Sequence, residues 1–182
     1  MSRFISEPLA KQDRSAFQSG NDRIDRYFQQ NASQDVKRGY TACYLLVEQS
    51  AKQSTKQSTK QSTSQIAGFY TLSSHSVALT EVADELARKL PRYPSVPAAL
   101  IGWMGRDANF RGQGIGPLLL ADAITRLARA PLGIHAICAD AIDDAAAAFY
   151  RRHQFEPLVS RPGRFYLPMK TALAAVATVS LA

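Results

Sequence analysis

Apolar and polar positions alternate along the chain in a way that predicts both strands and helices. Strand-like runs are expected at residues 4–9, 40–48, 66–72, 98–106, 134–140 and 164–169. Helical spacing of apolar residues predicts helices at residues 21–30, 33–37, 80–90, 117–129 and 143–153. The runs at 40–48 and 66–72 are expected to form a hairpin, and a β–α–β–α–β run follows them. This order predicts an α/β fold with a mixed sheet.

Two of the predicted helices carry clear signals at their ends. Thr80 can cap the first of them, and Pro91 is expected to end it. In the second, Pro117 suits the first helical position, because proline lacks the N–H group that would have no partner there. The apolar face predicted to point inward comprises Leu118, Leu119, Ile124 and Leu127.

A low-complexity segment separates the two hairpin strands. Residues 52–63 read KQST three times and contain no apolar side chain that could pack in a core. We expect a loop insertion at residues 51–65 within one domain over residues 1–170, since long surface loops cost little closure entropy. Residues 171–182 form an apolar tail, for which a helix, a frayed end and a partner-docking segment all remain open.

Composition excludes several classes of protein. The chain has 182 residues, of which 46% are apolar and 20% charged, as is ordinary for a globular domain. Its two cysteines exclude a disulfide scaffold, and the first residues lack the apolar core of a signal peptide. The longest apolar stretch is too short to span a bilayer, so we expect a cytoplasmic protein that does not associate with a membrane. The net charge of +7 favours partners that carry phosphate, although three of the lysines lie in the KQST repeat.

Three alternating glycines stand between a predicted strand and the helix at 117–129. Gly112, Gly114 and Gly116 let the backbone approach a ligand closely, and the helix N-terminus favours an anion there. The spacing excludes a Walker loop, because no lysine follows the glycines. It also departs from the dinucleotide fingerprint, which needs a glycine where Pro117 stands. The segment therefore predicts a pyrophosphate-binding loop of another kind.

The order Arg111-x-x-Gly114-x-Gly116 resembles the coenzyme A loop of the GNAT acetyltransferase superfamily. A later helix carries Asp143, Ala146 and Tyr150 at the spacing of that superfamily's Asn-x-x-Ala-x-x-x-Tyr motif. The resemblance implies a single GNAT domain, with a mixed, mostly antiparallel central sheet flanked by helices. It implies acetyl-coenzyme A as co-substrate, no metal, and Tyr150 as the general acid. The cofactor-binding residues that it implies are Met104, Gly105, Arg106, Arg111, Gly112, Gln113, Gly114, Ile115, Gly116 and Asp143.

Most of residues 5–169 further resemble the tRNA-acetylating toxins of type II toxin–antitoxin modules. The most distinctive segment is LPRYPSVPA at residues 90–98. The resemblance implies an enzyme that acetylates the α-amine of aminoacyl-tRNA and inhibits translation. It also implies a homodimer and a small ribbon–helix–helix antitoxin. Candidate tRNA contacts are Lys37, Arg38, Arg92 and Tyr93, three cations and one aromatic ring able to stack on a base.

Four residues depart from the pattern of these toxins. Trp103 and Arg106 replace an arginine and a small apolar residue on the central strand, and Asp143 replaces the usual asparagine. Gln154 stands where the toxins usually close a helix with glycine in the left-handed conformation, which costs about 1 kcal/mol if that geometry is kept. No histidine has a recognisable place as general base. Two alternatives therefore stay open, namely a GNAT enzyme acting on a small amine or protein N-terminus, and a catalytically degenerate binding module.

Overall fold

The computed structural model describes residues 3–49, 65–88 and 93–179. The KQST repeat and the end of the helix predicted at 80–90 therefore lie outside the described residues. By its internal contacts the chain divides into two compact units. Unit 1 comprises Met1–Tyr70 and Met104–Leu119, and unit 2 comprises Thr71–Trp103 and Leu120–Ala182.

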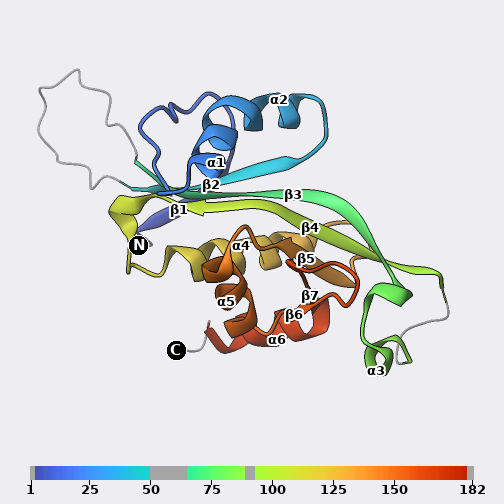
Figure 1. Cartoon of the computed structure of the whole chain (residues 1–182). Coiled ribbons are helices and arrows are strands. Elements are labelled where there is room, and N and C mark those ends of the chain that lie inside the picture. The colour runs from blue at the N-terminus through green and yellow to red at the C-terminus, as the bar shows by residue number, and fades with distance from the viewer. Residues whose placement is uncertain (1–2, 50–64, 89–92, 180–182) are drawn as a thin grey trace, which may run out of the picture. The chain divides into compact units, whose positions relative to one another are not determined.

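Unit 1 combines strands with the first helices of the chain. Its complete elements are β1 (Phe4–Pro8), α1 (Asp22–Arg26), a π-helical turn (Tyr27–Asn31), α2 (Ala32–Lys37) and β2 (Ala42–Glu48). It also holds the start of β3 (Ile66–Ala78), the end of β4 (Ser95–Arg106) and the first turn of α4 (Ile115–Arg129). Strands β1 and β2 are antiparallel, with Ser6 opposite Leu46. Figure 1 shows α1 and α2 in blue on one face of β1 and β2.

Stacked aromatic rings form the core of unit 1. Phe28 lies parallel to Phe69 with 4.0 Å between ring centroids, and Phe17 meets both rings edge-on. All three side chains are buried. The cluster packs the π-helical turn onto β3, because Phe28 and Phe69 come from those two elements.

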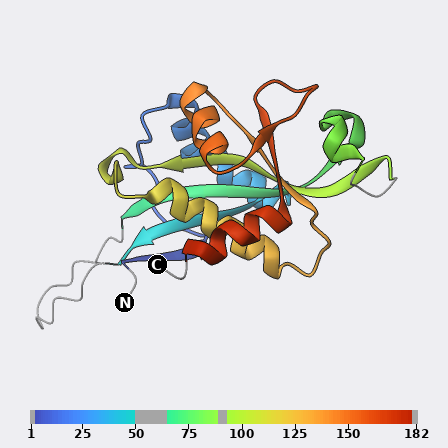
Figure 2. The same cartoon turned by 90° about the horizontal axis from the view of Figure 1, so that it is seen from below.

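Unit 2 contains the remaining strands and the C-terminal helices. Its own elements are α3 (Asp84–Ala87), β5 (Ala136–Asp140), α5 (Asp144–Arg152), β6 (Glu156–Pro157), β7 (Arg164–Pro168) and α6 (Met169–Val179). Strand β5 runs parallel to β4 and antiparallel to β7, and β6 pairs with β7 at the edge. Helix α6, red in Figure 2, follows directly on β7. The part of the C-terminal tail that the structure describes is therefore helical.

A second core lies under the strands of unit 2. It is built from small and branched side chains with one tyrosine: Val77, Val82, Val96, Ala98, Ala136, Cys138, Leu158 and Tyr166. Burial raises the pKa of the Cys138 thiol to about 12, so this cysteine is a packing group rather than a reactive one. The hydroxyl oxygen of Tyr166 is buried without a hydrogen-bond partner in the part of the chain that the structure describes.

The strands follow the order β1-β2-β3-β4-β5-β7-β6. The β4–β5 pair is parallel, whereas β1–β2, β5–β7 and β6–β7 are antiparallel, which confirms the predicted mixed, mostly antiparallel α/β fold. None of the helices in the described residues combines the length and apolar character needed to cross a bilayer.

Three details of the prediction are wrong. The helix expected at 80–90 is interrupted, because Val82 is extended (φ −99°, ψ 158°) and buries its side chain. A 3-10 turn (Leu79–Glu81) precedes it and α3 follows, so Thr80 is not a helix cap. Helix α4 begins at Ile115, which makes Pro117 its third residue. The buried face of α4 includes Ile115, Leu119 and Ala123. Leu118, which was predicted to point inward, is 43% exposed.

Candidate functional site

The glycine loop of unit 1 forms a tight turn directly before α4. Gly112 and Gly114 have φ angles of 76° and 73°, in the left-handed region that favours glycine. Apart from the adjacent residues in the chain, no atom of the described residues lies within 4 Å of the position that a Cβ would take at either glycine, so the turn is open on its outer side. The alternating glycines that the sequence singled out therefore give a backbone that a ligand can approach.

The first turn of α4 follows the loop without a break. The N–H of Leu118 donates to the carbonyl of Gly114 at 3.1 Å and closes the first helical ring. The N–H groups of Ile115 and Gly116 precede this ring, so they have no partner within the helix. Pro117 has no N–H, which explains why proline is tolerated in this first turn. Together the loop and helix start present backbone donors where the helix dipole favours an anion.

A buried carboxylate fixes the chain between β4 and the loop. Asp107 is 2% exposed and accepts backbone N–H groups from Asn109 at 2.9 Å and Gln18 at 3.0 Å. Its own N–H donates to the carbonyl of Ala67 at 2.9 Å. These bonds tie the strand end to β3 and to the segment before α1, so the loop starts from a rigid point.

Side chains at the end of β4 alternate between the two faces of the sheet. A Cβ on Gly105 would lie 2.7 Å from Cγ2 of Ile24 and 3.0 Å from Cε1 of Phe69, so this position faces the aromatic core. Met104 and Arg106 therefore point to the opposite face. On β3, a Cβ on Gly68 would meet the side chains of Ile115 and Leu119, which shows that this opposite face is the one that α4 covers.

Arg106 carries an unpaired charged donor on that face. Its Nη1 atom is buried and has no hydrogen-bond partner among the residues that the structure describes. Burying a charged donor without a partner is costly, so such an atom marks a place where water or an anionic ligand completes the hydrogen bonds. Arg106 was predicted from the sequence as a cofactor-binding residue, and it also departs from the pattern of the related toxins.

The predicted cofactor residues divide between the two units. Unit 1 holds the nine from Met104 to Gly116, on the end of β4, the glycine loop and the first residues of α4. Asp143 belongs to unit 2, where it caps α5 by accepting the N–H of Ala146 at 2.7 Å. An aspartate serves this capping role as well as an asparagine does.

Tyr150 lies in the last turns of α5 in unit 2 and is held by the way that helix ends. Gln154 has a φ of 65°, and it is the one non-glycine residue of the described chain in the left-handed region. Its N–H donates to Arg151 O at 3.0 Å, and the N–H of Phe155 donates to Tyr150 O at 3.1 Å. The Phe155 ring packs 5.2 Å from the Tyr150 ring. These contacts form a complete Schellman motif, with glutamine in the position usually taken by glycine.

The Tyr150 side chain is 4% exposed. Burial raises the pKa of its hydroxyl, and the negative charge of Asp140 raises this pKa further. The hydroxyl therefore keeps its proton at neutral pH and is available as a hydrogen-bond donor.

The predicted tRNA contacts are mostly exposed. Lys37 ends α2 and Arg38 caps it, and both side chains lie on the surface of unit 1. Tyr93 of unit 2 is 68% exposed, and Arg92 lies outside the described residues. The described residues contain no group of three or more His, Cys, Asp and Glu side chains that could hold a metal ion.

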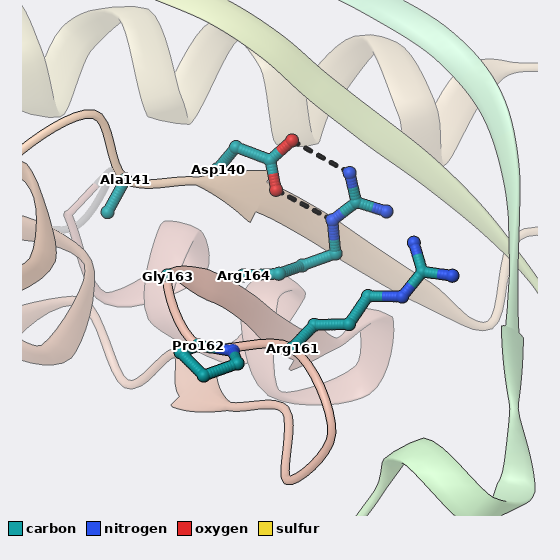
Figure 3. Close-up of a pocket in the computed structure, with 6 residues that line it drawn as sticks. All are labelled: Asp140, Ala141, Arg161, Pro162, Gly163 and Arg164. Atoms are coloured by element: carbon teal, nitrogen blue, oxygen red, sulfur yellow. Dashed lines mark hydrogen bonds and ion pairs between the residues drawn. The ribbon is translucent and has the colours of Figure 1, made fainter.

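Sequence reasoning missed a polar pocket in unit 2. The pocket has a volume of about 250 Å³ and is lined by Asp140, Ala141, Arg161, Pro162, Gly163 and Arg164 (Figure 3). Arg164 makes two hydrogen bonds to the Asp140 carboxylate, from Nε at 2.6 Å and from Nη2 at 2.8 Å. A Pro-Gly turn flanked by arginines was visible in the sequence, but its position beside Asp140 depends on strand pairing.

The chain is similar to known proteins over most of its length. The model of the Acetyltransferase (GNAT) family matches residues 39–155. A probable toxin TacT from Sinorhizobium fredii is 30% identical over 178 residues, which is 92% of each chain. A tRNA-acetylating toxin from Mycobacterium tuberculosis is 30% identical over 166 residues, which is 90% of each chain.

Solved structures of the toxin AtaT share the fold. AtaT complexed with acetyl-methionyl-tRNAfMet superposes with a TM-score of 0.79 at 21% identity, covering 94% of this chain and 98% of that chain. An AtaT mutant bound to acetyl-CoA and the C-terminus of the antitoxin AtaR has a TM-score of 0.75 at 20% identity. That alignment covers 96% of this chain and 98% of the other.

Proposed function

Because the chain belongs to the acetyltransferase (GNAT) family, we propose that it acetylates the α-amine of aminoacyl-tRNA with acetyl-coenzyme A. Blocking the amine would stop peptide-bond formation, so the protein would act as the toxin of a toxin–antitoxin pair. The observation that carries the proposal is the open glycine turn with left-handed Gly112 and Gly114, running directly into the first turn of α4. The name of one 30% identical relative, a tRNA-acetylating toxin, supports the activity, and the name of the other, a probable toxin, supports the role as a toxin.

The residues of unit 1 fit a cofactor that carries phosphate groups. The turn at Gly112–Gly114 and the free N–H groups of Ile115 and Gly116 would hold the pyrophosphate. The unpaired Nη1 of Arg106 lies on the face of the sheet that α4 covers, so it can complete its hydrogen bonds on an anionic group there. The backbone of Met104–Arg106 would hold the pantetheine arm. The cofactor supplies an acetyl thioester, whose carbon the amine attacks.

Tyr150 would interact with the thiolate that leaves the acetyl thioester. Its raised pKa means that it cannot readily surrender its proton to a thiolate, whose conjugate acid has a pKa of about 8.5. The hydroxyl therefore contributes chiefly by donating a hydrogen bond as negative charge grows on sulfur.

The reaction needs no strong base from the chain. An α-amino group has a pKa of about 7.7–8.0, and ester linkage to tRNA lowers it, so much of the amine is neutral at cellular pH. His75 is poorly suited to the role, because its Nε2 lies 3.2 Å from Nη1 of Arg164. Arginine can only donate, so this contact uses the acceptor nitrogen of the neutral ring. Water can then remove the proton.

Lys37, Arg38, Arg92 and Tyr93 would contact the tRNA. The exposure of the three described side chains supports this role, since phosphate pairing and base stacking need accessible groups. A homodimer, a ribbon–helix–helix antitoxin and a cytoplasmic location complete the proposal. Within the chain, residues 1–170 would be the acetyltransferase domain and residues 171–182 a C-terminal extension.

Labelled acetyl-coenzyme A offered to charged total tRNA tests the activity directly. We expect label on aminoacyl-tRNA, and none on deacylated tRNA or on tRNA whose amino acid is already N-formylated. Label on small amines or protein N-termini, with none on tRNA, would establish the alternative acceptor.

Tyr150→Phe tests the role of the hydroxyl. We expect kcat to fall about 10²-fold, in line with loss of a hydrogen bond to the charge that develops in the transition state. Tyr166→Phe is the matched control, because Tyr166 is also a buried tyrosine of unit 2 and its hydroxyl has no partner among the described residues. Equal activity of the two variants would remove Tyr150 from the mechanism.

A further inference from the structure

The pocket of unit 2 presents two guanidinium groups near the end of β5 and the start of β7. Figure 3 shows the side chains of Arg161 and Arg164 extending toward the same side, with Asp140 bound to Arg164. Asp140 also lies close enough to Tyr150 for its charge to raise the pKa of that hydroxyl. Phe165, which follows Arg164 on β7, places its ring 6.0 Å from the Tyr150 ring, so Tyr150 packs on the face of the sheet opposite to the one from which Arg164 projects. Asp140, at the end of β5, is therefore the pocket residue that lies near Tyr150.

Carboxylates orient the two arginines without using all of their donors. Oε1 of Glu81 binds Nε of Arg161 at 2.7 Å, and its Oε2 accepts the N–H of Ala78 at 3.0 Å. Both carboxylate oxygens of Glu81 are thus bound within the protein, and its side chain is 14% exposed, whereas the Arg161 side chain is 55% exposed. Within the described part of the chain the terminal nitrogens of Arg161 have no partner, so they are available to a ligand.

Arg164 is held more rigidly than Arg161. Asp140 takes its Nε and Nη2, and Nη1 meets His75, so the guanidinium plane is fixed. Each terminal nitrogen carries two hydrogens, and one hydrogen on each remains for a ligand. Two guanidinium groups with outward donors match the geometry of a phosphate group.

Backbone hydrogen bonds preorganise the loop that carries these side chains. The N–H of Arg164 donates to Arg161 O at 3.0 Å, and the N–H of Leu158 donates to Arg164 O at 2.8 Å. The N–H of Ala141 donates to Gly163 O at 2.8 Å, and Gly163 has a φ of 90°. The loop therefore needs little ordering when a ligand binds.

We propose that Arg161 and Arg164 form a phosphate-binding subsite for the acceptor strand of the aminoacyl-tRNA. The inference rests on the proposed function. It assigns to the substrate RNA a site that the motifs of the sequence did not indicate. The phosphates of the cofactor have their own donors in the glycine loop, so this pocket is available to the backbone of the acceptor. A phosphate bound here would bring the acceptor strand to the end of β5, where Asp140 lies near Tyr150.

Steady-state kinetics and tRNA binding of Arg161→Ala test the subsite. We expect the KM for aminoacyl-tRNA to rise about tenfold, the effect of losing one charge-assisted hydrogen bond. The kcat and the KM for acetyl-coenzyme A should remain within about twofold of wild type. In binding assays with deacylated tRNA, the slope of log K against log salt should decrease by about one.

Two further variants complete the design. Arg129→Ala removes the same charge from an exposed arginine at the end of α4, and it should leave all of these quantities within about twofold. Arg161→Lys keeps the charge and can still pair with Glu81, so it should keep the salt slope and recover part of the affinity.

The outcomes separate this inference from the proposed function. If wild-type protein acetylates no charged tRNA, the proposed function fails before the variants are compared. If wild type is active but Arg161→Ala matches Arg129→Ala in tRNA affinity and salt slope, the subsite is refuted alone. A rise in the KM for acetyl-coenzyme A without a rise for tRNA would assign the pocket to the cofactor and also overturn it.

Discussion

The left-handed glutamine at the end of α5 gives a sharp test of the local energetics. Gln154 has a φ of 65° in a Schellman motif that closes the helix carrying Tyr150. An L-residue in this conformation loses about 1–2 kcal/mol relative to glycine. Glycine in turn loses about 0.5–1 kcal/mol more conformational free energy on folding than other residues do. The Gln154 side chain is exposed, so its removal costs little packing. Gln154→Gly should therefore raise the free energy of unfolding by about 0.5–1 kcal/mol.

Chemical and thermal denaturation measure this gain. For a chain of this size the melting temperature should rise by about 1–4 °C. Gln154→Ala is the matched control, because alanine also carries a Cβ and should give no gain. Gln154→Asn should fall between glycine and glutamine, since asparagine tolerates the left-handed region. The reasoning is refuted if alanine stabilises as much as glycine, or if glycine gives no stabilisation.

Three further predictions concern other parts of the molecule. Gly105→Ala should destabilise the protein by about 1–3 kcal/mol in urea denaturation, because its Cβ would lie 2.7 Å from Ile24; Ile24→Ala in the same chain should recover part of the loss. Burial and neighbouring arginines lower the pKa of His75, so its contribution to stability is complete above about pH 6.5 and declines as the pH falls below that value. His75→Gln should therefore flatten the decrease in melting temperature between pH 7 and 5, and an unchanged slope would contradict the shift. Deprotonation of the substrate amine predicts that kcat/KM rises with pH to about 8. The raised pKa of Tyr150 predicts no decrease in kcat/KM due to tyrosine ionisation below pH 10.

Local signals in the sequence predicted much of the candidate site. The alternating glycines at 112, 114 and 116 predicted a turn before a helix, and two of the three adopt the left-handed conformation. The comparison of Gln154 with a glycine position predicted the strained helix end that the structure shows. Both features depend on a few consecutive residues, so the sequence carries the information in one place.

Features that depend on tertiary pairing were not predicted. The helix predicted at 80–90 had a capping residue and a proline stop in the sequence, but burial of Val82 in the core of unit 2 interrupts it. The pocket of unit 2 exists because the β5–β7 register sets Arg164 opposite Asp140, 24 residues away in the chain. No periodicity within either strand specifies that partner, because alternation determines the face of a side chain and not its neighbour across the sheet.

Arg106 shows how a departure from a family pattern acquires a physical role. In the sequence it stands where related toxins have a small apolar residue, which suggests a damaged cofactor strand. Strand alternation, however, directs its side chain away from the aromatic core that Gly105 faces and toward the face that α4 covers. An apolar residue there would fill the same space and donate nothing, whereas arginine leaves Nη1 buried and without a partner among the described residues. A buried charged donor is stable only when a ligand or water completes its bonds. The substitution therefore fits a strand that exchanges apolar packing for an anion contact, and it does not require that the strand has lost its cofactor.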